Sequence, residues 1–271
     1  MIQKLRQAML EQELDMLIVV STDEHLNEYP PAQNWRLEAS TSSGSSPGFS
    51  GSAGTAVFCL EGRSQLFVDS RYHIQAEQTS GENFEIQKLG NEGVLNPLEW
   101  IASLSEKALT VGADPYVMSQ KEWRGYENAV VKSGHSFKPT TPNLVDSVWV
   151  NRPNPPKNKI YPLVLKYTGK TSASKLADVR NKMNESEMGK DSKADVLLLT
   201  MLDEIAWLTN LRGSDIEYNP VFEAYAAIFQ DRALCFCHHP EADLNKYCPD
   251  WEFRPYAEYP EFLEKITQDE N

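Results

Sequence analysis

The stretch IQKLRQAMLEQELDMLIVVSTDE (residues 2–24) decides the fold, because the chain contains its pattern twice. The second version is LADVRNKMNESEMGKDSKADVLLLTMLDE (residues 176–204). In each version three apolar residues fall at positions i, i+3 and i+7, which predicts one apolar face of a helix. These residues are Ile2, Leu5 and Met9 in the first version, and Leu176, Val179 and Met183 in the second.

A short apolar run follows each predicted helix. MLIVV (16–20) comes after Asp15, and VLLLT (196–200) comes after Asp195. Such runs are typical of strands that are buried on both faces of a sheet. Each run is expected to end in a polar turn that carries an Asp-Glu pair, at 23–24 and at 203–204. The shared order indicates a duplicated α/β domain.

Further strands and helices alternate along both copies. In the first copy we expect strands at 64–69 and 108–114 and helices at 70–78 and 96–106; in the second, DEIAWLTNL, FEAYAAIFQ and ALCFC continue the apolar pattern. This alternation predicts the α/β class, with two similar domains that each hold a sheet flanked by helices. The predicted boundaries are a domain at 1–150, an extended and exposed proline-rich linker at 151–162, and a domain at 163–271.

Composition excludes several classes of protein. The chain has 26 Lys and Arg against 39 Asp and Glu, a net charge of −13, so a phosphate backbone is an unfavourable partner and no nucleic acid is expected. No apolar run approaches the ~20 residues of a membrane-spanning helix. The first residues lack the apolar core of a secretion signal. Four unevenly placed cysteines fit a reduced, cytoplasmic protein.

The loop GFSGSAGTAV (48–57) has the glycine spacing of a phosphate-binding loop. No lysine follows its last glycine, and TAVFCL (55–60) reads as a strand where a phosphate loop needs a helix. We therefore interpret the glycines as residues that allow positive φ in a sharp turn. The serine-rich segment at 38–47 just before the loop is expected to be a flexible, exposed insertion of unknown role.

Two clusters contain residue types that can bind metals. The first cluster is Cys235, Cys237, His238, His239 and Cys248, but its spacing does not match the usual zinc motifs, and ALCF favours a buried strand. The second is Asp23, Glu24, His25 and Glu28, which follow the first predicted strand. A weak metal or substrate site is possible there, but we favour a solvated loop.

Five motifs give the chain a family resemblance: SGSAGTAVF, FVDSRYHIQAEQ, VGADPYVMSQKEW, NLVDSVWVNRPNPP and LDEIAWLTNLRGSDIEYNPVFEAYAAI. Together they resemble the N-terminal part of the large, three-domain Xaa-Pro aminopeptidases of the creatinase/prolidase superfamily. The resemblance implies two α/β domains of creatinase/prolidase N-terminal type, followed by a pita-bread catalytic domain. It also implies a cytoplasmic homodimer that removes an N-terminal residue preceding proline.

The resemblance places the chemistry outside this chain. In that family two divalent metals, usually manganese, are held by two Asp, one His and two Glu of the third domain and activate a hydroxide. No stretch here resembles those ligand motifs, so we expect no catalytic or metal-binding residue in this chain and no activity of the chain alone. The second domain is expected to be truncated at its C-terminal end, and the catalytic domain would be the missing partner.

Three residues are candidates for a supporting role. Arg71 in DSRY matches an arginine of the family's DGRY pattern, so it is a candidate for the peptide cleft, although Ser70 replaces the usual glycine. The simpler alternative, which we favour, is an ion pair with Asp69 as the cap of a helix. Arg212 and Asp215 either brace a glycine-containing turn as a pair or contact the catalytic domain, and we weigh these equally.

Three hypotheses for the function follow. We favour the non-catalytic N-terminal half of an Xaa-Pro aminopeptidase, which shapes substrate access and supports dimerisation. The alternatives are a free-standing binding module without catalysis and, least favoured, an unrelated enzyme that uses the cluster at 23–28. A fragment that lacks its partner domain exposes apolar surface, so we also predict self-association.

Overall fold

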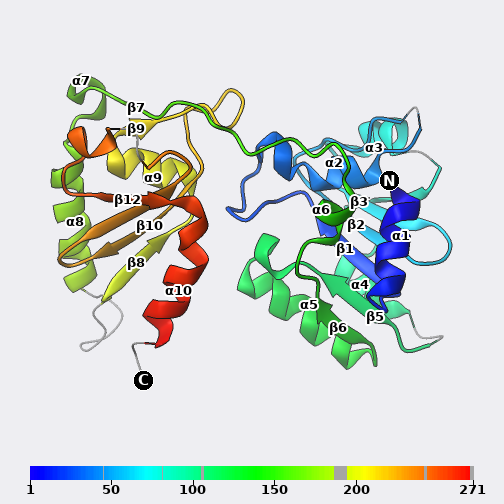
Figure 1. Cartoon of the computed structure of the whole chain (residues 1–271). Coiled ribbons are helices and arrows are strands. Elements are labelled where there is room, and N and C mark those ends of the chain that lie inside the picture. The colour runs from blue at the N-terminus through cyan, green and yellow to red at the C-terminus, as the bar shows by residue number, and fades with distance from the viewer. Residues whose placement is uncertain (45, 81, 105–106, 186–193, 241–242, 269–271) are drawn as a thin grey trace. The chain divides into compact units, whose positions relative to one another are not determined.

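The computed structural model describes all residues except 45, 81, 105–106, 186–193, 241–242 and 269–271 (Figure 1). The chain forms two compact units, Met1–Pro155 and Pro156–Asn271. Each unit contains its own mixed sheet with helices packed against it, which confirms the predicted α/β class. None of the helices in the described part is long and apolar enough to cross a membrane.

The first unit is built on a six-stranded sheet in the order β4-β3-β2-β1-β5-β6. Its strands are β1 (Met16–Val20), β2 (Gly54–Cys59), β3 (Ser64–Val68), β4 (Phe84–Lys88), β5 (Thr110–Ala113) and β6 (Ser136–Pro139). The central strand β1 pairs antiparallel with β2 and parallel with β5, and β6 continues parallel to β5. The carboxyl ends of β1, β5 and β6 therefore meet at one edge of the sheet.

Helices cover both faces of this sheet. They are α1 (Ile2–Glu11), α2 (Arg36–Thr41), α3 (His73–Thr79), α4 (Pro97–Ser103), α5 (Gln120–Lys132) and α6 (Leu144–Val148), with short 3₁₀ turns η1 (Ala32–Asn34) and η2 (Pro115–Val117). Alternate residues of β1 face opposite sides, so Leu17 packs in the core with α1, whereas Ile18 packs in the core with α4 and α5. The prediction that 16–20 is buried on both faces is confirmed.

The second unit has a four-stranded sheet in the order β12-β11-β10-β8. Its strands are β8 (Val196–Leu199), β10 (Ala224–Phe229), β11 (Ala233–Cys237) and β12 (Glu252–Pro255), and a separate pair joins β7 (Tyr161–Pro162) to β9 (Leu211–Arg212). The helices are α7 (Leu165–Thr168), α8 (Ser172–Asn184), α9 (Leu202–Thr209) and α10 (Tyr259–Gln268), with 3₁₀ turns η3 (Leu244–Lys246) and η4 (Tyr256–Glu258). The helices α8 and α9 pack in one core and α10 in another.

The two copies of the repeat differ in their surroundings. Among the described residues the strand β8 lies at the edge of its sheet and pairs with β10 alone, and Leu198 remains 38% exposed. The expectation that this run is buried on both faces is therefore wrong. The pair at 203–204 is also not in a polar turn: it forms the first turn of α9, where carboxylates interact favourably with the helix dipole.

The serine-rich segment also differs from the expectation of a flexible, exposed insertion. The helix α2 extends to Thr41, and Ser40 and Thr41 are fully buried. Thr41 Oγ1 donates to the Leu37 carbonyl at 2.8 Å and accepts from the Phe49 N–H at 2.8 Å. Short hydroxyl side chains can be buried here because the local backbone satisfies their hydrogen bonds.

The proline-rich segment divides between the two units. Residues 153–155 and 157–159 are exposed, as expected of a linker. Ile160, by contrast, is buried, and Tyr161–Pro162 pairs with β9 in the second unit. The segment before Pro153 is held to the first unit by the side chain of Arg152, which contacts Gln33 and Asp146. The domain boundaries themselves stay a prediction.

Candidate functional site

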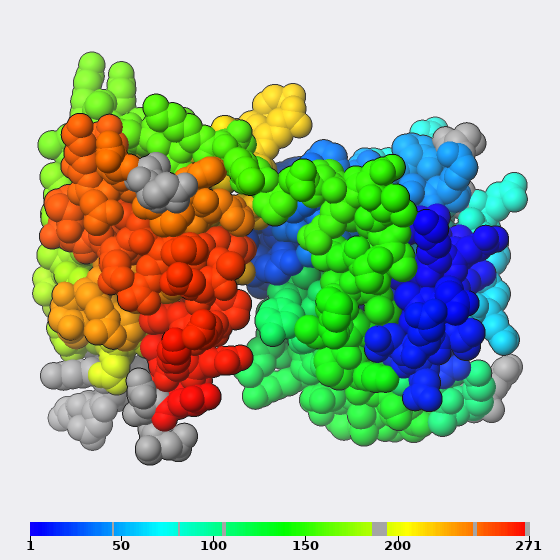
Figure 2. Space-filling view, viewed as in Figure 1, coloured from blue at the N-terminus to red at the C-terminus, as the bar shows by residue number. Residues whose placement is uncertain are grey.

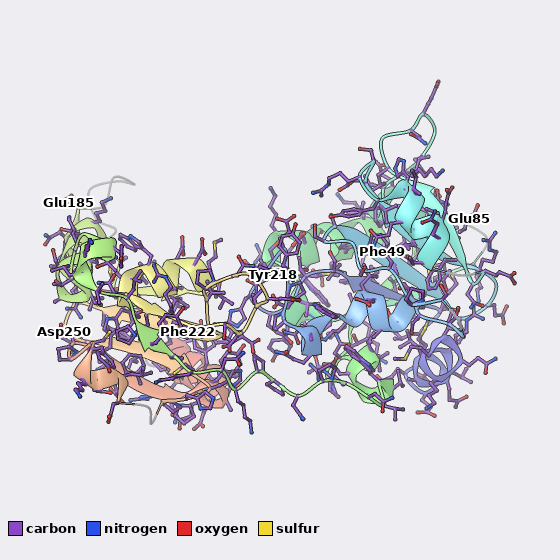
Figure 3. All side chains as sticks on the ribbon, turned by 90° about the horizontal axis from the view of Figure 1, so that it is seen from above. Phe49, Glu85, Glu185, Tyr218, Phe222 and Asp250 are labelled. Carbon is purple, nitrogen blue, oxygen red and sulfur yellow. The ribbon has the colours of Figure 1, made fainter. Side chains whose placement is uncertain are left out.

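The glycine loop is shaped by the ring of Phe49. Only Gly48 has a positive φ, of +98°. A Cβ atom at Gly51 would lie 2.3 Å from Phe49 Cζ, and one at Gly54 would lie 2.6 Å from Phe49 Cε1. Phe49 is buried inside the first unit, as Figure 3 shows. Close packing also requires glycine at position 48, where a Cβ would lie 2.1 Å from the Glu38 carbonyl oxygen. The interpretation of the loop as a positive-φ turn holds for Gly48 alone.

Arg71 lies in a polar group on the surface of the first unit. Its Nη2 is 2.8 Å from Asp69 Oδ2, and its Nη1 is 3.9 Å from Glu28 Oε1. Ser52 of the glycine loop donates to Glu28 Oε1 at 3.0 Å and lies 2.8 Å from the Tyr72 hydroxyl. We call Arg71, Asp69, Glu28, Ser52 and Tyr72 the Arg71 cluster.

The expected ion pair between Arg71 and Asp69 is present, but Asp69 does not cap a helix. The helix α3 begins at His73, and no side chain caps its first turn. Asp69 Oδ1 instead accepts the backbone N–H of Arg71 at 2.9 Å, and the hydrogen bond from the guanidinium lowers the pKa of Asp69. More than half of the Arg71 side-chain surface is exposed, so its charge is available to a ligand.

The four candidate residues at 23–28 do not converge on one point. Asp23 is fully buried and accepts from the N–H groups of His25 and Asn27 at 3.0 Å, so it shapes the turn after β1. His25 is also buried, whereas Glu28 faces Ser52. The solvated loop that we favoured is therefore wrong for Asp23 and His25. Glu24 shares the Asn34 side-chain amide with Asp23 as a hydrogen-bond donor and belongs to a further group.

That group is a buried ion network centred on Arg36, which sequence analysis missed. Arg36 is 3% exposed; its Nη2 lies 2.6 Å from Glu24 Oε1, and its Nε lies 2.9 Å from Asp146 Oδ1. Asp146 also binds Arg152 Nη1 at 3.0 Å. Burial raises the pKa of Glu24, but the hydrogen bond and charge of Arg36 outweigh it and hold that pKa below its usual value. No local pattern indicates this network, because Arg36 and Asp146 lie 110 positions apart.

Arg152 extends the network to the end of the first unit. Its Nε donates to the Gln33 carbonyl at 2.8 Å, and its Nη2 donates to Asn34 Oδ1 at 3.3 Å. The guanidinium therefore joins the start of the proline-rich segment to the turn before α2.

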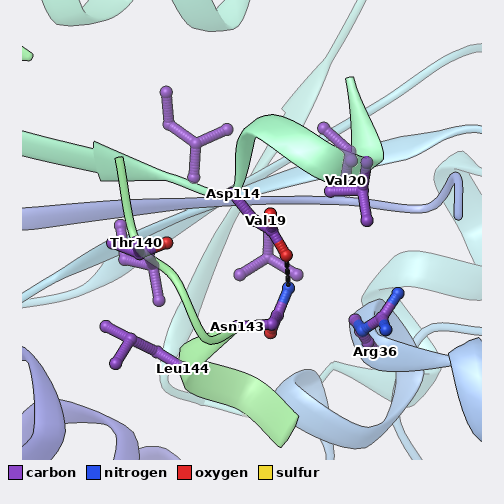
Figure 4. A pocket seen from close by; sticks show the side chains of 10 residues that line it. Val19, Val20, Arg36, Asp114, Thr140, Asn143 and Leu144 are labelled. Carbon is purple, nitrogen blue, oxygen red and sulfur yellow. Dashed lines mark hydrogen bonds between the residues drawn. The ribbon is translucent and has the colours of Figure 1, made fainter. Parts of the chain in front are cut away.

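A small cavity lies beside this network at the carboxyl ends of β1, β5 and β6 (Figure 4). Its polar lining comes from Arg36, Asp114, Thr140 and Asn143. Asp114 accepts from the Tyr116 N–H at 2.9 Å and from Asn143 Nδ2 at 2.7 Å, and burial raises its pKa. Ligands of α/β proteins commonly bind at this edge of the sheet. At about 10 Å³ the cavity is too small for an organic ligand.

In the second unit Arg212 and Asp215 support the loop at 213–223 separately. Arg212 Nη1 donates to the carbonyls of Ala206 and Leu211, at 2.5 and 2.8 Å. Asp215 Oδ2 accepts the Glu223 N–H at 2.8 Å. Among the described residues no ion pair joins Arg212 to Asp215. The predicted brace is present, but as two independent contacts instead of a pair.

The loop at 213–223 is closely packed at its base and exposed at its tip. A Cβ at Gly213 would lie 2.7 Å from Phe222 Cβ, so the two sides of the loop are in close contact. Glu223 is buried, and its Oε2 lies 3.3 Å from His238 Nε2. Tyr218 at the tip has φ +63° and is 95% exposed (Figure 3). Figure 2 shows this loop, in yellow, projecting from the surface.

The cysteines of the second unit belong to its core. All of β11 is buried, which confirms the strand predicted at 233–237, and Cys235 and Cys237 pack in one cluster with Cys248. Cys248 Sγ donates to the Thr209 carbonyl at 3.0 Å, and burial raises its pKa to about 12. Within the described ranges no three His, Cys, Asp or Glu residues are placed to hold a metal ion.

Comparison with known families gives two adjacent matches. Residues 1–148 match the family model of the creatinase/prolidase N-terminal domain. Residues 151–271 match a second model with the same description. Between them the two models account for nearly the whole chain.

The chain is similar to longer curated proteins. It is 40% identical over 231 residues to a probable Xaa-Pro aminopeptidase P from Neosartorya fischeri, covering 85% of this chain and 33% of that protein. It is 37% identical over 260 residues to a probable Xaa-Pro aminopeptidase P from Sordaria macrospora, covering 94% of this chain and 40% of that protein. The chain thus spans well under half of these relatives.

One solved structure has the same fold over most of the chain. It is the X-prolyl aminopeptidase from Caenorhabditis elegans, described as a cytosolic enzyme with a di-nuclear active site. The match has a TM-score of 0.85 and 24% identity, and it covers 94% of this chain and 40% of that chain. At this identity the similarity bears on the fold alone.

Proposed function

Because the chain belongs to the creatinase/prolidase N-terminal domain family, we propose that it is the non-catalytic N-terminal half of a metal-dependent Xaa-Pro aminopeptidase. The observation that carries this proposal is the pair of adjacent matches at 1–148 and 151–271, together with relatives that bear this name at 37–40% identity. The substrates would be peptides with proline at the second position. The enzyme would be a cytoplasmic homodimer.

The metal pair would belong to the part of the enzyme outside this chain. The described residues do not fit a di-nuclear centre, since no three potential ligands come together. We therefore assign no chemical step to this chain and expect it to be inactive alone. Manganese remains the metal that we propose for the complete enzyme.

The Arg71 cluster would help to shape access to the substrate. Arg71 is held by Asp69 on one side and reaches Glu28 on the other, so its half-exposed guanidinium has a defined position. A guanidinium binds carbonyl and carboxylate oxygens, which are the acceptors that a peptide offers. The glycine loop supports this position through Ser52.

The loop at 213–223 would contact the rest of the enzyme or its dimer partner. Arg212 and Asp215 hold its base by hydrogen bonds to the backbone. A bulky residue with positive φ is strained, and such strain tends to persist at functional positions. Exposed tyrosines on rigid supports are common anchors of protein interfaces. We therefore assign Tyr218 to the contact.

The deciding experiment compares two forms of the protein with an Xaa-Pro peptide and Mn²⁺. The purified 271-residue chain is expected to show no turnover. The product of the source gene that includes the sequence beyond Asn271 is expected to carry the Asp, Asp, His, Glu, Glu set and to release the first residue. Turnover by the 271-residue chain would overturn the proposal. A stop codon after Asn271 would favour a binding module without catalysis instead.

A further inference from the structure

The strands β5 and β6 end side by side, and each is followed by a polar residue. Ala113 pairs with Pro139 in the parallel register, and the Thr140 N–H donates to the Ala113 carbonyl at 2.8 Å. Asp114 and Thr140 therefore occupy neighbouring positions at the edge of the sheet. Both side chains line the cavity shown in Figure 4.

The hydroxyl of Thr140 in the lining has no hydrogen-bond partner in the described structure. Thr140 is 2% exposed, yet its Oγ1 is unpaired. Buried polar groups in native proteins are almost always paired, with the protein or with ordered water. An unpaired buried hydroxyl in the lining of a cavity indicates that the cavity itself supplies a partner.

The orientation of Thr140 is set by its methyl group. A Cβ added at Gly112 would lie 2.8 Å from Thr140 Cγ2, so the methyl packs closely above the backbone of β5. Rotation about the Thr140 Cα–Cβ bond would remove this contact. The neighbouring Asp114 carboxylate has acceptor capacity left, because it receives only the hydrogen bonds of Tyr116 and Asn143 in the described structure.

We propose that this cavity is a binding site for one ordered water molecule, which hydrogen-bonds Thr140 Oγ1 and the Asp114 carboxylate. Its volume of about 10 Å³ is close to the space that one water requires. Charge disfavours an anion, since the carboxylates of Glu24 and Asp146 already balance Arg36 and Arg152, and Asp114 adds another carboxyl group. The Arg36 guanidinium in turn repels a metal cation. A neutral ligand with both a donor and an acceptor fits.

Charged side chains of the chain itself fill the edge of the sheet around the cavity, and the remaining space holds a structural water. The site is independent of the function proposed above.

A high-resolution crystal structure of the chain tests the proposal directly. We expect a water peak at about 2.5–3.0 Å from Thr140 Oγ1 and from an Asp114 carboxylate oxygen. An empty cavity, or a hydroxyl that bonds only protein atoms, would overturn it.

Thr140→Val gives an independent test, because a hydrated and a dry cavity predict different changes in the thermal midpoint of unfolding. Valine keeps the shape of threonine, so the variant removes the hydroxyl and little else. If water is bound, the thermal midpoint falls by about 2–4 °C, because a satisfied hydrogen bond is lost. If the cavity is dry, the midpoint stays or rises, because an unpaired buried hydroxyl is removed, and the proposal fails.

Two further variants calibrate this measurement. Thr140→Ser keeps the hydroxyl and should retain the water peak. Thr41→Val removes a hydroxyl whose partners are the Leu37 carbonyl and the Phe49 N–H, so its midpoint must fall in either case. A Thr140→Val shift with the same sign as that of Thr41→Val supports the hydrated site.

Discussion

Single residues of the glycine loop show that one sequence signal can have several physical causes. Gly48, Gly51 and Gly54 are equally spaced, but only Gly48 needs a left-handed backbone. The other two leave room for the buried ring of Phe49. The sequence contains all three glycines and the phenylalanine, yet the contact between them depends on how the loop folds back.

Gly51→Ala is expected to destabilise the first unit by about 1–3 kcal/mol, because the new methyl overpacks a buried site. Its Cβ would lie 2.3 Å from the Phe49 ring. Urea unfolding followed by circular dichroism measures the change. Gly125→Ala is the control: its Cβ would meet only Leu98 Cδ1 at 3.8 Å within a helix, so the variant should be neutral or more stable. Equal destabilisation by both variants would contradict the packing argument.

Arg36→Gln is expected to cost about 3 kcal/mol, since it removes the cation of Glu24 and leaves Asp146 with only Arg152 among its described cation partners. The free energy of unfolding in urea measures this loss. Lys265→Gln is the control, because its ion pair with Glu261 lies on the exposed surface of α10 and should contribute nothing measurable. An Arg36→Gln variant as stable as Lys265→Gln would show that the network does not stabilise the unit.

Glu24→Gln is expected to change the pH dependence of stability. The pKa of Glu24 is lower in the folded protein than its ordinary value of 4.5, so its stabilising contribution is present above pH 4.5 and is lost as the pH falls below it. The difference in unfolding free energy between the wild type and Glu24→Gln should therefore be largest near neutral pH and shrink on acidification. A difference that grows towards low pH would contradict this assignment.

At the scale of elements, local sequence patterns predict the helices and strands but not how deeply each of them is buried. The runs at 16–20 and 196–200 look alike in sequence, and both form strands. Their burial differs because β1 has a neighbouring strand on each side, whereas within the described part of the chain β8 pairs with β10 alone. Strand order is set by contacts between distant segments, which a local apolar pattern does not encode.

Arg152→Gln is expected to loosen the segment that leaves the first unit. Arg152 connects this segment to the Gln33 carbonyl and to Asp146, so its loss frees residues 149–155. Hydrogen–deuterium exchange should become faster at the backbone N–H groups of residues 149 and 152. In the wild type, the Trp149 N–H donates to the Val145 carbonyl and the Arg152 N–H donates to the Trp149 carbonyl. Lys159→Gln in the exposed part of the same segment should leave the exchange unchanged. Equal exchange in all three proteins would show that Arg152 does not hold the segment.

At the scale of the whole molecule, the surface of the second unit carries exposed apolar side chains on and around α7 and α9. In the second unit Val164, Leu165 and Tyr167 are each more than half exposed around α7, and Trp207 on α9 is half exposed. Isolated apolar residues are normal on a surface, but neighbouring exposed apolar residues such as the three around α7 favour an interaction site. We therefore assign the self-association predicted from the sequence to this surface around α7.

The purified chain is expected to self-associate at high concentration through this surface. Light scattering measures the mean mass, and Leu165→Glu should shift the chain towards the monomer by placing a charge in the contact. Ile74→Glu on α3 of the first unit serves as the control, because it changes an exposed apolar residue outside the surface around α7. A strictly monomeric wild type would contradict the prediction.

The sequence by itself determined the two α/β units, most helices and strands, and the family, because hydrophobic periodicity and long motifs are local properties of the chain. Only the tertiary structure decided which residues meet. Arg36 finds Asp146 at 110 positions away, Asp23 is buried instead of solvated, and Thr140 comes to lie beside Asp114. The physical reason is that burial and pairing depend on the order and register of the strands, which bring together residues that no short stretch of sequence connects.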